Sequence, residues 1–197
     1  MVNFIRSIFN PERRVPYSIV ALLDEEHDRF IRSIWREMAT EMDVQLPFKN
    51  PIPHITHLQA RDIETDALHD ALRQFANLQT PYIIRTTGLG IFTGTYNAVY
   101  VPVVRTPNMT AIQTDLIATL ASSLEDISET HLINNWIPHI TLAMSLSGDD
   151  IDKLIGIVKL LARRNFAWEF TVTRLALLDG HIDSEEMPFT VTLKNDG

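Results

Sequence analysis

The sequence of 197 residues contains no cysteine, and this absence removes several classes of protein at once. Without thiols the chain cannot form disulfides, bind a metal through thiolates or use a cysteine nucleophile. It also lacks an uninterrupted apolar run of about 20 residues, which a membrane-spanning helix requires. Residues 1–14 contain no long apolar stretch and no small-residue cleavage site, so they do not resemble a signal peptide. We therefore expect no membrane association and a cytoplasmic location.

Positive charge is also scarce. The chain has 17 lysines and arginines against 25 aspartates and glutamates, which gives a net charge of −8 at pH 7. Binding a long nucleic acid through its phosphates favours a basic protein. A nucleotide or a short RNA or oligonucleotide is therefore the expected partner, and no long duplex is expected. The length and the 45% hydrophobic content fit one globular domain with a substantial core, expected as a monomer.

The tetrapeptide Pro-His-Ile-Thr occurs twice, at residues 53–56 and 138–141, each time within a short apolar run. Successive side chains of a β-strand point to opposite faces of the sheet. Each copy therefore directs an imidazole and a hydroxyl to one face, with Ile55 or Ile140 buried on the other. Two such strands brought together would place two histidines and two threonines around one space, an arrangement suited to chemistry on an anion.

The elements around the two copies recur in the same order: strand, helix, motif strand, helix, strand and turn. Apolar spacing predicts them at 17–23, 24–42, 54–58, 62–80 and 82–92, then at 98–104, 108–124, 137–143, 148–161 and 166–178, with a last strand at 189–193. His54 and His139 lie 85 residues apart, and the turn glycines Gly94 and Gly180 lie 86 apart. The matched register indicates an internal duplication.

We therefore expect an α+β fold with two lobes, at about 17–94 and 98–180, that together form one domain over residues 17–197. Each lobe should contain an antiparallel sheet with outer helices, and a pseudo-two-fold axis should relate the lobes across a central cleft. Residues 1–16 precede the duplicated unit as an N-terminal extension with no assigned role.

Two His-x-Thr motifs, each on a strand and about half of a duplicated α+β chain apart, resemble those of the 2H phosphoesterase superfamily. That superfamily includes the bacterial 2′-5′ RNA ligase-like proteins and the RNA 2′,3′-cyclic phosphodiesterases. The resemblance covers about residues 17–193. It implies chemistry on a cyclic or 2′-5′ phosphodiester without a metal or cofactor, with catalysis by His54, Thr56, His139 and Thr141. The sequence departs from the pattern at His57, where an apolar residue would be expected after the first motif.

The motif residues suit that chemistry. Opening a 2′,3′-cyclic phosphate with water requires a base for the nucleophile and an acid for the departing ribose oxygen, on opposite sides of phosphorus. Histidine can perform both roles, because its ordinary pKa of about 6.5 allows both protonation states near neutrality. The threonine hydroxyls can donate hydrogen bonds to the non-bridging oxygens as charge moves onto them. The sequence leaves open which imidazole is the acid and which the base.

Other interpretations of these residues exist. The two motif histidines could bind zinc, but the chain offers no cysteine and no evident third ligand. Strand alternation turns His57 away from His54, so a packing or surface role is expected for it. A nucleotide-binding regulator could use the same cleft without turnover, whereas a plain structural domain would leave the repeated motif unexplained.

Aromatic residues that flank the central strands are candidates for stacking a nucleobase. These are Phe92, Tyr96, Tyr100 and Trp136. They complete the predicted site as substrate-binding residues, and no metal ligand is predicted.

Overall fold

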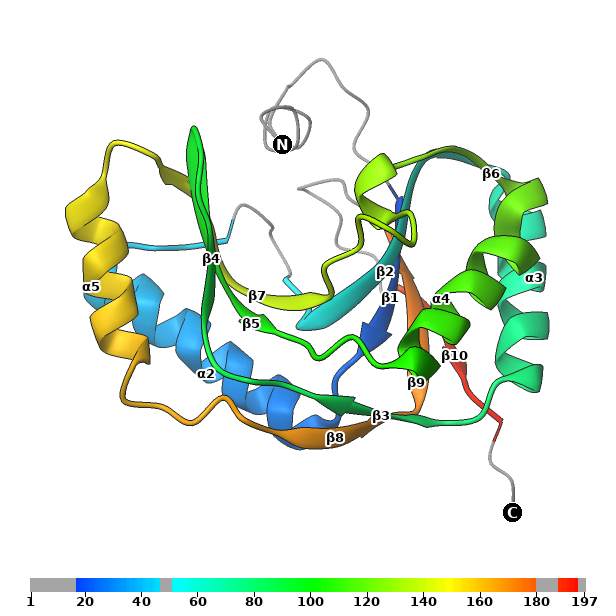
Figure 1. Ribbon diagram of the computed structural model, residues 1–197, viewed down its shortest axis with the longest axis horizontal. Helices are drawn as coiled ribbons and strands as arrows, with labels where there is room; N and C mark the ends of the chain where they lie inside the picture. The colour runs from blue at the N-terminus through cyan, green and yellow to red at the C-terminus, as the bar shows by residue number, and fades with distance from the viewer. Residues whose placement is uncertain (1–16, 47–50, 180–187, 195–197) are drawn as a thin grey trace.

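The elements of a computed structural model can be followed in Figure 1 for residues 17–46, 51–179 and 188–194, which are the residues that the structure describes. The expected extension at 1–16 and the turn glycine Gly180 lie outside these ranges. The α+β class with antiparallel sheets, expected from the sequence, is confirmed. Within the described ranges, each helix is too short or too polar to cross a membrane.

The first sheet contains five strands in the order β10-β9-β1-β2-β6. They are β1 (Tyr17–Leu22), β2 (His54–Ile63), β6 (Leu124–Ile127), β9 (Arg174–Leu178) and β10 (Phe189–Thr192). A three-stranded sheet in the order β4-β5-β7 and a separate β3–β8 pair form the rest of the strand structure. They consist of β3 (Tyr82–Arg85), β4 (Gly90–Phe92), β5 (Tyr96–Pro102), β7 (His139–Ser147) and β8 (Glu169–Val172). A bridge between Thr86, just after β3, and Val103, just after β5, links the β3–β8 pair to the three-stranded sheet.

Capping side chains fix the starts of three helices. Asp24 accepts from the backbone N–H of His27 at the start of α2 (Glu25–Met42), and Thr106 caps α4 (Pro107–Leu120) in the same way. Asp150 does so for α5 (Ile151–Leu161). Each oxygen satisfies a backbone donor that has no partner within the helix. A further helix, α3 (Thr65–Leu78), packs against α4 and β10, whereas α2 packs against α5 and β7.

The strands and helices are exchanged between the two halves of the chain. Strand β9 of the second half pairs with β1, beside β2, whereas β4 of the first half pairs with β5, beside β7. In the same way α4 packs beside α3, and α2 packs beside α5. Ile84 of β3 pairs directly with Phe170 of β8, 86 positions later, so equivalent positions of the repeat meet there. The ranges 17–94 and 98–180 therefore describe the repeat in the sequence, and each sheet contains strands of both.

This exchange of strands between the two halves explains two differences between the observed strands and those predicted from the sequence. The segments 82–92 and 166–178 are each predicted as one strand, but the first forms β3 and β4 and the second forms β8 and β9. Each segment leaves one sheet and enters another. Between β3 and β4 the turn passes through Gly88, whose φ of 134° is accessible to glycine and strained for other residues.

A third difference follows from the length of the first motif strand. The sequence predicts a helix up to residue 124, but α4 ends at Leu120 and the one-turn helix η1 (Ala121–Ser123) follows. Strand β2 extends to Ile63 and provides an edge for β6, which pairs Leu124 with Ile63. The helix predicted over residues 62–80 therefore starts later, because Asp62 lies in β2 and α3 begins only at Thr65.

Candidate active site

The two motif strands lie side by side at the centre of the molecule (Figure 1). His54 is the first residue of β2, and His139 is the first residue of β7. Ile55 and Ile140 are fully buried in the core, whereas the histidine and threonine on either side of each isoleucine are half-buried. Both strands thus show the alternation expected from the sequence, and each presents an imidazole and a hydroxyl on the face away from the core.

Each motif histidine is held by the same backbone hydrogen bond. The Nδ1 atom of His54 lies 2.6 Å from the carbonyl oxygen of Ile52, and Nδ1 of His139 lies 2.7 Å from that of Ile137. A carbonyl oxygen can only accept, so Nδ1 carries the proton in both rings. The Nε2 atom of each ring therefore remains available, as a lone pair in the neutral form and as an N–H in the charged form.

The sequence contains a signal for this anchor that the tetrapeptide leaves out. An isoleucine and a proline precede both histidines, as Ile52-Pro53 and as Ile137-Pro138. A proline restricts the residue before it to extended conformations and offers no N–H of its own. The repeated Ile-Pro pair thus supplies the carbonyl, two residues before each histidine, that holds the ring.

The environment lowers the pKa of both imidazoles. Burial is the main cause of the lowered pKa of His54, the bond to Ile52 opposes it, and repulsion from a charged His139 adds to it. Burial likewise lowers the pKa of His139, against the bond to Ile137. Because a charged His139 affects the pKa of His54, the two imidazoles lie within electrostatic range of each other. A lowered pKa favours the neutral imidazole, which is the form that a general base needs.

Hydrogen bonds between the two motif segments fix their relative position. The indole Nε1–H of Trp136, three residues before His139, donates to the carbonyl oxygen of Thr56 over 2.8 Å. The backbone N–H of Val103 donates to the carbonyl of Pro138 over 3.1 Å. Through these contacts the chain entering the second motif is attached to the first motif on one side and to the end of β5 on the other.

Two aromatic rings lie beside His139. Tyr100 pairs with Thr141 across β5 and β7, and its ring stacks on Phe92 with centroids 4.1 Å apart. The His139 ring meets Phe92 and Tyr100 edge-on, at 5.1 and 5.2 Å. The Tyr100 ring also lies over Gly90, where a Cβ atom would come within 2.5 Å of it. Glycine at position 90 therefore leaves the space that the Tyr100 ring occupies.

The other two aromatic candidates occupy different positions. Tyr96 is exposed and starts β5, four residues before Tyr100, which is about 13 Å along a strand. Trp136 is only 3% exposed, and its ring contacts the ring of His57 and the guanidinium of Arg105. We therefore assign Trp136 to packing and to the bond with Thr56, and we do not include it in the proposed substrate surface.

Two histidines outside the motifs also lie near the site. His57 is completely buried and has a packing role, the first of the two roles expected for it. His131, in the one-turn helix η2 (Glu129–His131), is 9% exposed and was not singled out in the sequence. Its pKa is lowered to about 3 by burial, with smaller contributions from repulsion by His139 and His57. The role of His57 cannot be recognised by spacing, because its partners Gln113 and Tyr82 come from distant segments.

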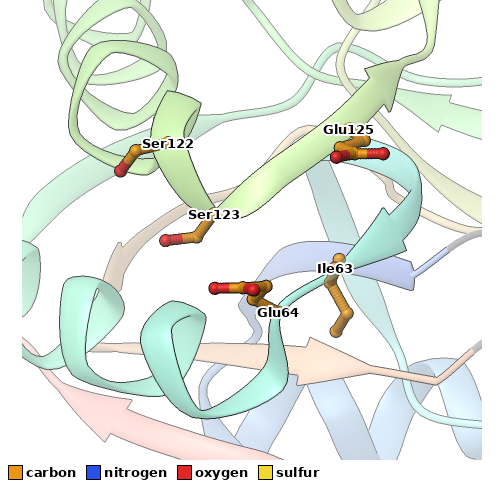
Figure 2. Close-up of a pocket in the computed structure, with 5 residues that line it drawn as sticks. All are labelled: Ile63, Glu64, Ser122, Ser123 and Glu125. Atoms are coloured by element: carbon orange, nitrogen blue, oxygen red, sulfur yellow. The ribbon is translucent and has the colours of Figure 1, made fainter.

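Figure 2 shows a pocket at the end of β2 opposite to His54. It is lined by Ile63, Glu64, Ser122, Ser123 and Glu125. Ile63 ends the strand that His54 begins, roughly 30 Å further along β2. The carboxylates of Glu64 and Glu125 in this pocket would repel a phosphate, so we do not consider the pocket as the substrate site. Among the described residues, no group of three histidine, aspartate or glutamate side chains is arranged to hold a metal ion.

Comparison with known proteins identifies the family. The model of the 2′-5′ RNA ligase superfamily matches residues 23–183. The chain belongs to this superfamily of 2H phosphoesterases, as the two motifs indicated. A Bacillus pumilus protein named "Putative phosphoesterase" is 29% identical over 129 residues, which cover 64% of this chain and 70% of that protein. A similarly named protein of Bacillus cytotoxicus is 24% identical over 129 residues, or 64% and 69% of the two chains.

Solved structures with the same fold are more distant in sequence. E. coli LigT in complex with 3′-AMP superposes with a TM-score of 0.59 at 15% identity, covering 93% of this chain and all of that one. Usb1 of Kluyveromyces marxianus gives a TM-score of 0.52 at 10% identity, over 93% of this chain and all of that one. These two structures share the overall arrangement described above.

Proposed function

We propose that this protein is a metal-independent phosphoesterase that hydrolyses a 2′,3′-cyclic or 2′-5′ phosphodiester bond of a nucleotide or RNA end. The observation that carries the proposal is the matched anchoring of His54 and His139. Both rings offer Nε2 on the face away from the core, and both have a half-buried threonine hydroxyl two residues later on the same strand face. Membership of the superfamily supports the assignment to phosphoester chemistry.

The proposed division of labour follows from this symmetry. One imidazole is neutral and accepts a proton through Nε2 from the attacking water as the new P–O bond forms. The other is protonated when the anionic phosphodiester is bound, because a negative charge beside the ring favours the imidazolium against the effect of burial. It donates its Nε2 proton to the ribose oxygen as the P–O bond to ribose breaks. Thr56 and Thr141 donate hydrogen bonds to the non-bridging oxygens, where negative charge increases in the transition state.

We place the nucleoside on the side of His139. Tyr100 pairs with Thr141 on one neighbouring strand and with Gly90 on the other. In the other half Val20 pairs with Thr56 and with Ala176, so Val20 occupies the position equivalent to Tyr100. By the same pairings Phe92 is equivalent to Leu178. In the described part of the chain, the aromatic contacts of a motif histidine are those of His139 with Phe92 and Tyr100, and stacking on such rings binds bases with little sequence preference. E. coli LigT, which has the same fold, was solved with 3′-AMP and with NADP⁺, which supports a nucleotide ligand.

The proposal can be tested with a panel of phosphodiesters and purified protein. The panel contains nucleoside 2′,3′-cyclic phosphates, 2′-5′ and 3′-5′ dinucleotides, with products separated as 2′- or 3′-phosphates. We expect turnover of a cyclic or 2′-5′ substrate by the wild type and by a His69→Ala control on α3, and a kcat about 10²–10⁴-fold lower for His139→Ala. A nucleotide that binds the wild type but is recovered intact would favour the alternative, a nucleotide-binding regulator. Equal turnover by wild type and His139→Ala would refute the assigned site.

A further inference from the structure

The residue that departs from the family pattern, His57, is the centre of a buried hydrogen-bond network. Its ring is 0% exposed, although it directly follows the first motif. Nδ1 lies 3.2 Å from the amide oxygen of Gln113 on α4, and Nε2 lies 2.6 Å from the hydroxyl oxygen of Tyr82 on β3. One side chain of β2 thus contacts a helix and a strand that are 56 and 25 residues away in sequence.

The direction of each hydrogen bond in the network can be assigned. The amide nitrogen of Gln113 donates to the backbone carbonyls of His57 and His131, so its oxygen faces the His57 ring as an acceptor. His57 therefore donates from Nδ1, and its Nε2 accepts from the Tyr82 hydroxyl. Burial lowers the pKa of His57 to about 4 and raises the pKa of Tyr82. All three side chains are neutral at pH 7, and the hydrogen bonds of both His57 nitrogens are satisfied.

The network reaches the catalytic strands through Trp136. The His57 ring contacts the indole of Trp136, with centroids 5.2 Å apart, and Arg105 lies over the indole at 5.9 Å. That indole donates to the carbonyl of Thr56, while Gln113 donates to the next carbonyl, that of His57. The carbonyls of Thr56 and His57 are therefore bound by Trp136 and Gln113, and both of these side chains contact the His57 ring. Trp136 lies three residues before His139.

We propose that His57, together with Gln113, is a positioning residue that holds the indole of Trp136 and so sets the separation of His54 and His139. The proposal rests on the proposed function, because the separation of the two rings matters only if both act on one phosphodiester. An apolar residue at position 57 could fill the same volume. It would leave the Tyr82 hydroxyl and the Gln113 amide oxygen without their partner, and these two groups would have to move to find new ones.

The decisive variants are His57→Leu and His57→Gln. Leucine removes both hydrogen bonds, whereas a glutamine amide can again donate to Gln113 and accept from Tyr82. We expect kcat on the wild-type substrate to fall by up to about 10²-fold in His57→Leu, the loss that a shift of about 1 Å can cause, with KM changed much less. His57→Gln should recover most of that loss. Trp136→Phe, which removes the indole N–H together with part of the ring, should resemble His57→Leu. The double variant His57→Leu/Trp136→Phe should be no slower than either single variant.

A second measurement separates this proposal from the proposed function. The ring signals of His54 and His139 can be followed by NMR with ¹³C-labelled histidine, whether or not the protein turns over a substrate. We expect both signals to shift and titrate differently in His57→Leu and to stay at wild-type positions in the control His69→Leu. Unchanged His54 and His139 signals in folded His57→Leu would overturn the positioning role, even for an active enzyme. If His57→Leu does not fold, Tyr82→Phe and Trp136→Phe serve in its place, with the same outcomes.

Discussion

Lowering the pH from 7 to 5 should destabilise the folded protein because of two histidines that do not take part in the chemistry. His57 and His131 are buried, and their pKa values are lowered to about 4 and about 3. In the unfolded chain both return to an ordinary pKa of about 6.5. Below that pH the unfolded state binds protons that the folded state does not. The stability associated with these neutral rings is therefore fully present above pH 6.5 and is lost as the pH falls toward the folded values.

The size of the loss follows from the two pKa values. Each group that is protonated only in the unfolded state changes the free energy of unfolding by about 1.4 kcal/mol per pH unit. Between pH 6.5 and 5 one histidine therefore contributes about 2 kcal/mol, and the two together about 4 kcal/mol. Burial also lowers the pKa of His54 and His139, so these residues act in the same direction.

Urea unfolding followed by tryptophan fluorescence at pH 7, 6 and 5 measures this effect directly. With a slope of about 2 kcal/mol per molar urea, the midpoint should fall by about 2 M between pH 7 and 5. His57→Gln removes one of the two groups and should reduce the pH dependence by about 1.4 kcal/mol per unit. A free energy of unfolding that changes by less than about 1 kcal/mol over this range would refute the assignment of both rings as neutral in the folded state.

The remaining predictions concern activity. His54→Ala and His139→Ala should each lower kcat by about 10²–10⁴-fold, and the double variant should be far from additive because acid and base act in one step; additive losses in kcat would contradict this. Thr141→Val should reduce kcat less than either histidine variant, since it removes one donor and leaves proton transfer in place; a loss as large as that of His139→Ala would speak against this role. Hydrolysis should persist in excess EDTA, and activity restored only by added zinc or manganese would indicate metal-ion catalysis. Tyr100→Ala should raise KM for a nucleotide substrate by about 5- to 150-fold through the loss of about 1–3 kcal/mol of stacking, measured by initial rates, while Tyr100→Phe should remain near wild type.

The motif strands were the most predictable part of the structure, because their positions depend on local rules. The alternation of buried Ile55 and Ile140 with half-buried neighbours follows from the strand period. Asp24 caps its helix as its position before an apolar-periodic segment predicts. These features require only the few residues around them. The family and the α+β class could therefore be inferred from the sequence, whereas the cytoplasmic location and the monomeric state stay predictions.

The features that the sequence did not reveal depend on partners far along the chain. Nothing within 82–92 shows that this segment leaves one sheet for another, apart from glycines at 88 and 90. Strand β6 forms because β2 is long enough to offer it an edge. The burial of His57 depends on Gln113 and Tyr82, which no spacing rule connects with it. The sequence suggested Trp136 as a stacking residue because it could not reveal the partner of the indole N–H, the carbonyl of Thr56, which lies 80 residues away.

The duplicated unit has diverged beside its histidines rather than at them. The carbonyl that fixes each imidazole is the same in both halves, and so is the hydroxyl two residues later. The neighbouring strands differ, with Tyr100 over Gly90 on one side and Val20 paired with Ala176 on the other. In-line displacement at phosphorus needs two comparable proton-transfer groups on opposite sides, whereas a nucleotide carries its base on one side only. A symmetric pair of histidines with the aromatic rings of Phe92 and Tyr100 beside His139 would meet both requirements under the proposed function, in which the shared motif acts on the phosphoryl group and the differing neighbours orient the nucleoside.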